Sequence, residues 1–367
     1  MNLNPASRLL MASTLVAVLP LSSAGQDVTV EQWSPRSTLV VPEHPTPRAK
    51  FPFVDVHSHH FRPPSPEDLD SLITAMDEMN MGVMVNLSGG TGDRLVAMID
   101  AMKSRAPRRF AVFANVDFRG IGEPGWSERA AEQLERDVRS GAQGLKIFKS
   151  LGLSVVDSDS ARVPVDDPRI DAVWAKAGEL GIPVLIHSAD PRQFWEPNDS
   201  TNEKWLELKL RPRRARAADD PAPWEQIIAE QHRVFKRHPG TTFINAHLGW
   251  FGNDLQHLGN LMDEMPNMYV GIGAIIAELG RQPRTARNFF IQYQDRILFG
   301  KDSWVPEEFP TYFRVLESDD EYFPYHKKYH AFWAMYGMDL PDEVLKKVYY
   351  KNALKIVPGI DRSGFPQ

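Results

Sequence analysis

The chain has 367 residues, of which 42% are hydrophobic, so it is long enough and apolar enough to form one large buried core. Its formal net charge is −6 and it has no basic stripe, which argues against a nucleic-acid partner. It has no cysteine, so disulfides and thiolate ligands are excluded, and a bound metal would need nitrogen and oxygen ligands.

The first 24 residues have the pattern of an export signal. Arg8 precedes an apolar run over residues 9–19, Pro20 follows the run, and residues 22–24 are small, as at a cleavage site. The run is shorter than the ~20 residues that span a bilayer, so we expect no stable membrane anchor after the signal is removed. The alternative is a buried N-terminal helix. We predict a signal peptide at residues 1–24 and export to the periplasm or the extracellular space.

Residues 25–50 have the composition of a linker. They contain four prolines, which argue against regular structure. These are Pro35, Pro42, Pro45 and Pro47. We expect the remaining residues, 51–360, to form one domain.

From residue 51 onwards, apolar runs alternate with amphipathic stretches. This alternation is typical of repeated strand–helix units around a parallel sheet. Eight runs have strand character, which is the strand number of a (β/α)8 TIM barrel. They are residues 53–57, 82–87, 110–117, 144–148, 183–187, 242–247, 268–272 and 297–300.

Three further segments have local signals. Ser65 with Asp68 predicts the start of a helix, and Asp167 predicts another that Gly181 ends. Residues 190–223 form a long insertion after the fifth strand, at the end of the barrel where loops usually shape an active site. The alternative is a solvated surface loop, which its cluster of arginines would suit. We expect residues 307–358 to form a helical tail.

Polar residues close several of the predicted strands. His57 and His59 follow the first strand, and their side chains should share one face because side chains alternate along a strand. His187, His247 and Asp302 close three later strands. The carboxyl ends of barrel strands meet at one mouth, so His57, His59, His187 and Asp302 could surround one divalent metal. Imidazoles with a carboxylate suit zinc, with manganese or iron as alternatives.

These strand-end residues and four further motifs resemble the amidohydrolase superfamily, more closely its amidohydrolase-related branch, over residues 51–358. The motifs are Gly-Leu-Lys-Ile-Phe at 144–148, Ala-His-Leu-Gly at 246–249, Leu-Phe-Gly-Lys-Asp at 298–302 and Lys-Asn-Ala at 351–353. The resemblance implies a TIM barrel of the metal-dependent hydrolase type, acting on a small molecule with a metal-activated water.

The resemblance also implies roles for individual residues. Asp302 would be both a metal ligand and the catalytic proton carrier. His247 would polarise the substrate carbonyl or bind a second metal. Lys146 resembles the lysine that is carboxylated in two-metal relatives, whereas one-metal relatives keep it unmodified; we expect one ion rather than two. Trp250 and Glu278 are candidates for substrate binding, as is Arg281.

Two departures bear on the reaction. Decarboxylases of this branch often have Glu-x-His or Glu-x-Ala on the first strand and a Glu soon after the His-x-Gly of the sixth strand. Here the first motif is His57-x-His59 and Trp250 stands at the second position. Both departures favour hydrolysis of an amide, a lactone or another ester over decarboxylation. A non-catalytic binding protein is the third alternative. The sequence names neither the substrate nor the oligomeric state, and a homo-oligomer stays open.

Overall fold

The computed structural model describes residues 27–366, which belong to two compact units divided after Thr38. The expected signal peptide lies outside the described residues. Within residues 27–38 the backbone forms a turn in which Gln32 and Trp33 donate to the carbonyl of Thr29. The second unit begins at Leu39 and contains every helix and strand of the described chain.

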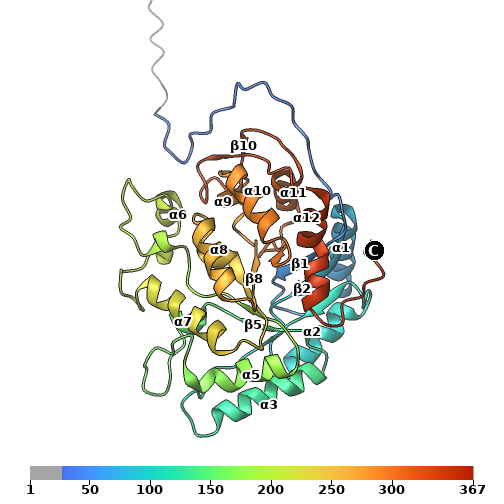
Figure 1. Ribbon diagram of the computed structural model, residues 1–367, viewed down its shortest axis with the longest axis vertical. Coiled ribbons are helices and arrows are strands. Elements are labelled where there is room, and N and C mark those ends of the chain that lie inside the picture. The colour runs from blue at the N-terminus through green and yellow to red at the C-terminus, as the bar shows by residue number, and fades with distance from the viewer. Residues whose placement is uncertain (1–26, 367) are drawn as a thin grey trace, which may run out of the picture. The chain divides into compact units, whose positions relative to one another are not determined.

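The second unit is an α/β TIM barrel with parallel strands (Figure 1). Hydrogen bonds connect β1, β2 and β3 in one sheet and β4 to β9 in another. The strands are β1 (Phe53–Ser58), β2 (Met81–Asn86), β3 (Phe110–Val112), β4 (Ala114–Asn115), β5 (Leu145–Ile147), β6 (Val184–Ile186), β7 (Phe243–Asn245), β8 (Met268–Gly271) and β9 (Ile297–Leu298).

The two sheets are joined at both of their edges. β3 and β4 correspond to one predicted strand, which is interrupted at Phe113. The N–H of Phe113 donates to the carbonyl of Asn86 in β2, whereas the N–H of the next residue, Ala114, donates to the carbonyl of Gly144 beside β5. At the other edge the N–H of Val56 donates to Phe299 at 3.1 Å, which links β1 to the end of β9. All eight predicted strands are therefore confirmed.

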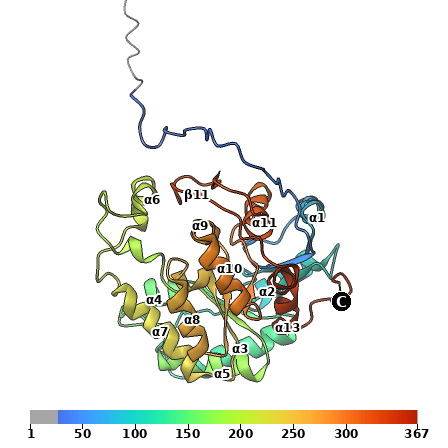
Figure 2. The same cartoon turned by 45° about the horizontal axis from the view of Figure 1, so that its top comes forward.

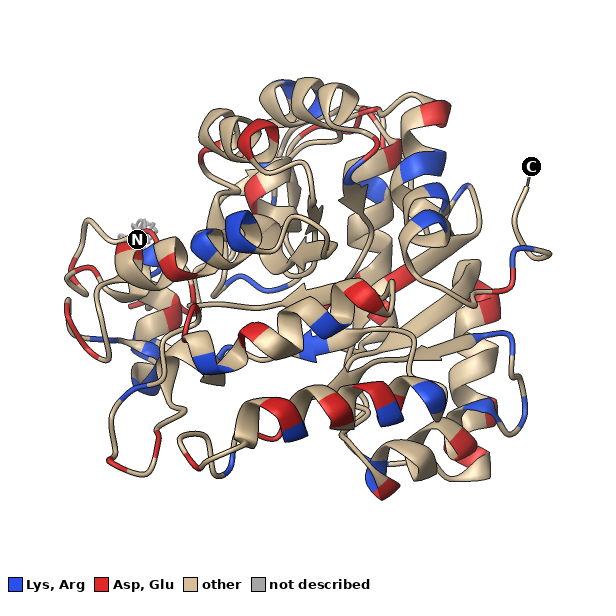
Figure 3. Cartoon of the chain, turned by 60° about the horizontal axis from the view of Figure 1, so that its bottom comes forward, with Lys and Arg blue, Asp and Glu red and all other residues tan. Residues whose placement is uncertain are grey.

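Seven longer helices and three short ones lie between β1 and β9 along the chain, and Figure 2 shows helices surrounding the central strands. The longer ones are α1 (Pro66–Met79), α2 (Asp93–Lys103), α3 (Trp126–Arg139), α5 (Asp171–Glu179), α7 (Trp224–Arg237), α8 (Leu255–Glu264) and α10 (Pro283–Gln292). The short ones are α4 (Ser150–Leu153), α6 (Trp205–Leu210) and α9 (Ile276–Gly280). In Figure 3 acidic and basic residues are interspersed along the helices that face the viewer. No helix among residues 27–366 is long and apolar enough to cross a membrane.

The predicted helix starts are confirmed. Ser65 caps α1, its side chain accepting from the N–H of Asp68 while the carboxylate of Asp68 accepts from Ser65. Asp167 caps the short turn that leads into α5, and Gly181 lies just beyond the helix with φ +64°. A left-handed residue after a helix is a common terminator, and glycine adopts that conformation without strain.

The insertion over residues 190–223 is anchored rather than freely solvated. It contains α6 and two short 3-10 turns, Arg192–Phe194 and Pro212–Arg214. Trp195 donates to the carbonyl of Ala222, and Trp224 donates to that of Asp190, so indole groups tie both ends of the insertion together.

The helical tail is only partly helical. α11 (Phe309–Glu317) begins it, and α12 (Asp342–Lys346), a π-helical turn (Lys347–Lys351) and α13 (Asn352–Ile356) end it. Between them, residues 318–341 carry only the short antiparallel strands β10 (Phe323–Pro324) and β11 (Ala334–Met335). Pro324 and Pro341 disfavour a continuous helix here.

Aromatic rings pack this tail against the joint between the first and last strands. Phe53 of β1 lies edge-on to Phe299 at 4.7 Å between ring centroids, and both contact Phe313 of α11 and Tyr349. Residues 39–50 have no helix or strand, but they contact the same region, since the N–H of His44 donates to the carboxylate of Asp320.

Candidate active site

Four histidines and one aspartate gather at the carboxyl ends of the strands. An oxygen of Asp302 lies 3.2 Å from Nε2 of His57 and 3.6 Å from Nε2 of His59. Nε2 of His247 lies 3.3 Å from Nδ1 of His187. The structure therefore brings together all five residues that the sequence singled out as ligands or catalytic groups.

The tightest group differs from the predicted ligand set, because it lacks His59 and His187 and includes His247. Ligand atoms of His57, His247 and Asp302 all lie within 4.8 Å of one another. His187 is not in this trio and reaches it through His247, although the sequence placed His187 among the ligands and His247 at the edge. The rings of His187 and His247 are 4.4 Å apart, so both still face one space.

The backbone around this cluster is unusually constrained. Ten non-glycine residues of the described chain have positive φ, and six of them follow the carboxyl ends of β6, β7, β8 and β9. The six are Ala189, His247, Leu248, Trp250, Ala274 and Asp302. Such conformations cost on the order of 1–3 kcal/mol each and concentrate at functional sites.

Two glycines leave room for His57. A Cβ added at Gly300 would lie 2.8 Å from Cβ of His57, and one at Gly273 would lie 3.1 Å from its Nδ1. Any larger residue at Gly300 would displace the imidazole or the end of β1.

Asp55 ties the first strand to the last one beneath the site. Its carboxylate accepts from the backbone N–H groups of His57 and Lys301, at 2.9 and 3.1 Å. Burial raises its pKa to about 7. The sequence pattern assigns Asp55 no role, because its carboxylate positions backbone and does not line the pocket.

Protonation at the site suits metal ligation. Burial lowers the pKa of all four imidazoles, that of His59 to about 2 and that of His247 to about 3. Burial would raise the pKa of Asp302, but its contacts with His57, His247 and His59 lower it well below the usual range. Neutral imidazoles and an ionised carboxylate are the forms that bind a metal.

Hydrogen bonds orient two of the imidazoles. Nδ1 of His247 lies 2.6 Å from the carbonyl oxygen of Gly273, which can only accept, so Nδ1 carries the proton and Nε2 keeps its lone pair toward the cluster. His59 is held by Ser88, whose hydroxyl is 2.8 Å from its Nδ1. Trp250 stacks on His247 at 4.5 Å and donates to the carbonyl of Ser188.

Several buried nitrogens in the described chain lack a hydrogen-bond partner, and four of them belong to this site. They are Nδ1 of His57, Nε2 of His187 and Nζ of Lys146, together with Nε2 of His57, which lies 3.2 Å from the carboxylate of Asp302 without hydrogen-bond geometry. A buried polar atom without a partner costs ~1–3 kcal/mol, and a metal ion is the partner that would satisfy several such nitrogens at once. The residues therefore fit a divalent metal held by imidazole and carboxylate.

Lys146 lies on β5 with its side chain inside the barrel. Its exposed fraction is 1%, its Nζ is 5.3 Å from the ring centroid of Phe148, and burial lowers its pKa to about 7.

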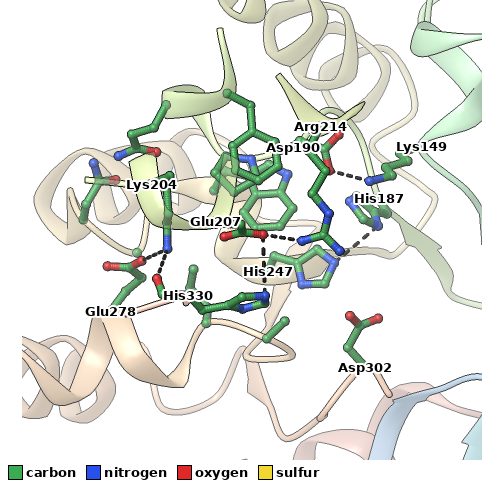
Figure 4. A pocket seen from close by; sticks show the side chains of 18 residues that line it. Lys149, His187, Asp190, Lys204, Glu207, Arg214, His247, Glu278, Asp302 and His330 are labelled. Carbon is green, nitrogen blue, oxygen red and sulfur yellow. Dashed lines mark hydrogen bonds and ion pairs between the residues drawn. The ribbon is translucent and has the colours of Figure 1, made fainter. Parts of the chain in front are cut away.

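A cavity of about 150 Å³ opens beside the cluster, and His187, His247 and Asp302 line it (Figure 4). Trp250 and Glu278 also line it, as candidates for substrate contact should. Arg281 does not line it and instead pairs with Glu278 and Glu203. The insertion and the tail supply further wall residues without a sequence signal: Asp190, Pro191, Gln193, Phe194, Lys204, Glu207, Arg214 and His330.

The chain belongs to the amidohydrolase family, because residues 38–359 match the family model described as "Amidohydrolase". This is a family of enzymes that act on small molecules and typically bind a divalent metal. No curated protein matched the chain in the sequence comparison.

Two solved structures illustrate the shared fold. One is a protein from Staphylococcus aureus described as an amidohydrolase, at 16% identity and a TM-score of 0.52. The other is 2,6-dihydroxybenzoate decarboxylase with 2,6-dihydroxybenzoate, at 17% identity and a TM-score of 0.51. Each alignment covers 83% of this chain and 99% of the other. At these identities the likeness supports the barrel and not the reaction.

Proposed function

We propose that this protein is an exported metal-dependent hydrolase that cleaves an amide, a lactone or another ester bond. One observation carries the proposal: buried, unpartnered imidazole nitrogens and an ionised carboxylate converge at the wall of a cavity large enough to admit a small molecule. A divalent metal bound there, zinc for preference, would supply Lewis acidity, which lowers the pKa of a water and polarises a carbonyl.

The protein's own residues would then move the proton. Asp302 is ionised, lies beside His57 and His59, and faces the cavity, so it can accept a proton from the attacking water and return it to the leaving group. His247 has a fixed tautomer with Nε2 toward the cluster. It is suited either to ligation or to contact with the substrate carbonyl.

The number of metal ions bound depends on the chemical state of Lys146. Its unpartnered amine, with a pKa lowered to about 7, can be partly neutral at physiological pH and so could react with carbon dioxide to form a carbamate, releasing a proton; that carbamate would supply oxygen ligands for a second ion. We favour one ion, with Lys146 as a buried cation near the carboxylate of Asp302. Lys146→Ala would then leave the metal stoichiometry near one, whereas a two-metal enzyme would lose an ion.

The second candidate function is decarboxylation, since a decarboxylase shares the fold. Against it stand His57 and Trp250, at positions where the decarboxylases of this branch often carry glutamates. Metal analysis of the purified protein, with an activity screen over lactones, amides, esters and aromatic acids, tests the choice. Release of carbon dioxide from an aromatic acid, with no turnover of any lactone, ester or amide, would replace hydrolysis by decarboxylation.

Export is tested separately. N-terminal sequencing of the secreted or periplasmic protein should find a start near residue 25, and an intact Met1 on intracellular protein would refute export.

A further inference from the structure

The cavity beside the cluster has three cations in its wall, and each already has a buried carboxylate as partner. Lys149 pairs with Asp190, Arg214 with Glu207, and Lys204 with Glu278 (Figure 4). The three carboxylate side chains have exposed fractions of only 7%, 4% and 9%.

Further contacts hold the same carboxylates. Asp190 also lies 3.0 Å from Arg216, Glu278 lies 3.0 Å from Arg281, and Glu207 lies 3.5 Å from Nε2 of His330. The three carboxylates are therefore fixed in the folded wall, although the side chains of Lys149 and Arg214 are 44% and 46% exposed.

A substrate carboxylate could bind in this part of the cavity only by replacing one of the wall carboxylates as the partner of a cation. To bind it, Arg214 or Lys204 would have to turn away from Glu207 or Glu278. Glu278 would keep Arg281 as a partner, whereas Glu207 would lose its hydrogen-bonded cation. In both cases the pairing of a buried carboxylate is weakened, so the new ion pair would replace an existing one without net gain.

A hydroxyl group avoids that exchange. It can donate to the carboxylate and accept from the cation of the same pair, while the pair stays intact. Phe194 and Trp250 line the same cavity and offer apolar faces to the carbon skeleton.

We propose that this cavity selects the uncharged, hydroxyl-bearing part of a substrate and rejects substrates that carry a carboxylate there. The inference rests on the proposed hydrolytic function for the position of the scissile bond, but the recognition itself depends only on the ion pairs. The wall thus narrows the substrate class from any ester, lactone or amide to a neutral polyhydroxylated one.

The test compares two matched lactones with the metal-loaded protein. Gluconolactone is neutral, and glucarolactone carries a carboxylate in place of the terminal hydroxymethyl group. Calorimetric binding and initial rates of hydrolysis should both favour gluconolactone. In Glu207→Gln, Arg214 loses its partner and becomes available to an anion, so the preference should shift toward glucarolactone by roughly tenfold or more.

The matched control is Glu230→Gln. Glu230 is a buried glutamate on α7 that pairs with Arg162 and does not line the cavity. It should leave the ratio of the two affinities unchanged. If the carboxylate of glucarolactone binds the metal directly, it does so in every variant. That contribution therefore cancels when the affinity ratios of the variants are compared. Glu278→Gln, which removes the partner of Lys204, provides a second test if Glu207→Gln does not fold.

The outcomes separate this inference from the proposed function. If gluconolactone does not bind, if glucarolactone binds better to the unmodified protein, or if Glu207→Gln and Glu278→Gln leave the ratio unchanged, the inference is wrong even when other lactones are hydrolysed. If the lactones bind as expected but no ester, lactone or amide is cleaved, recognition by the ion pairs stands and hydrolysis is wrong.

Discussion

Asp302 combines a strained backbone with the central position in the cluster. Its φ of +89° turns the chain sharply after β9, and its N–H donates to the carbonyl of His57 at 2.7 Å. The same turn places its carboxylate against His57 and His59. The unfavourable backbone conformation of Asp302 is therefore the cost of holding its carboxylate in a fixed place.

Asp302→Asn tests the role of that carboxylate. Asparagine tolerates a positive φ and has nearly the same shape, so the fold should survive. An amide cannot accept the proton, so kcat on a substrate found by the screen should fall about 10²–10⁴-fold. Asp137→Asn is the control, because Asp137 is buried and accepts from Thr91 and Gly92 away from the cavity. Near-normal turnover in Asp302→Asn would exclude the proton transfer.

Gly300→Ala tests whether the narrow space around His57 is required. The added Cβ would lie 2.8 Å from Cβ of His57 and 3.3 Å from its backbone nitrogen, so either β1 or β9 must shift. We expect a loss of about 1–3 kcal/mol in the free energy of unfolding together with reduced metal content. Gly240→Ala is the control, since nothing lies within 4 Å of its added Cβ. Full metal content in Gly300→Ala would show that His57 tolerates displacement.

At the scale of elements, the clearest local signal is the start of α1. Ser65→Ala removes the side chain that accepts from Asp68, and such losses cost ~0.5–2 kcal/mol. Urea unfolding should show that decrease at an unchanged slope. Ser71→Ala lies within the same helix and should be neutral or slightly stabilising, because alanine is the better helix former. Equal effects of the two changes would contradict a capping role.

Local signals of this kind made the strands, the helix starts and the clustering of the strand-end residues predictable. Histidines at strand ends can be recognised in the sequence because apolar runs precede them, as residues 183–186 precede His187. Glu207 and His330 could not be found this way. They lie in irregular or briefly helical segments 123 positions apart, and only tertiary packing of the insertion against the tail brings them within 3.5 Å. The break at Phe113 was likewise hidden inside one apolar run.

At the scale of the whole molecule, the buried histidines link folding to pH. Burial lowers the pKa of His57, His59, His187 and His247 at the site. It also lowers that of His232 and His326 to about 4 and that of His330 to about 3. In the unfolded chain each imidazole would titrate near 6.5.

The metal-free protein should therefore lose stability as the pH falls below about 6.5. Between the unfolded and folded pKa values the unfolded chain binds protons that the folded chain excludes, so each imidazole lowers the free energy of unfolding by about 1.4 kcal/mol per pH unit in that window. Asp55, with its pKa raised to about 7, contributes in the opposite sense, as do Glu207 and Glu317, whose pKa values burial also raises, but these are three groups against seven imidazoles. Thermal melts from pH 8 to pH 4 should show a steep decrease in Tm below pH 6.5.

A bound metal should steepen that dependence. It stabilises only the folded state, and protons compete for its imidazole ligands, so the gain in Tm on adding zinc should be large at pH 7.5 and shrink toward pH 5. His59→Gln is the matched variant, because it removes one candidate ligand and should reduce the zinc-dependent gain. A gain in Tm that is independent of pH, or equal in His59→Gln, would mean that the ion binds elsewhere on the protein.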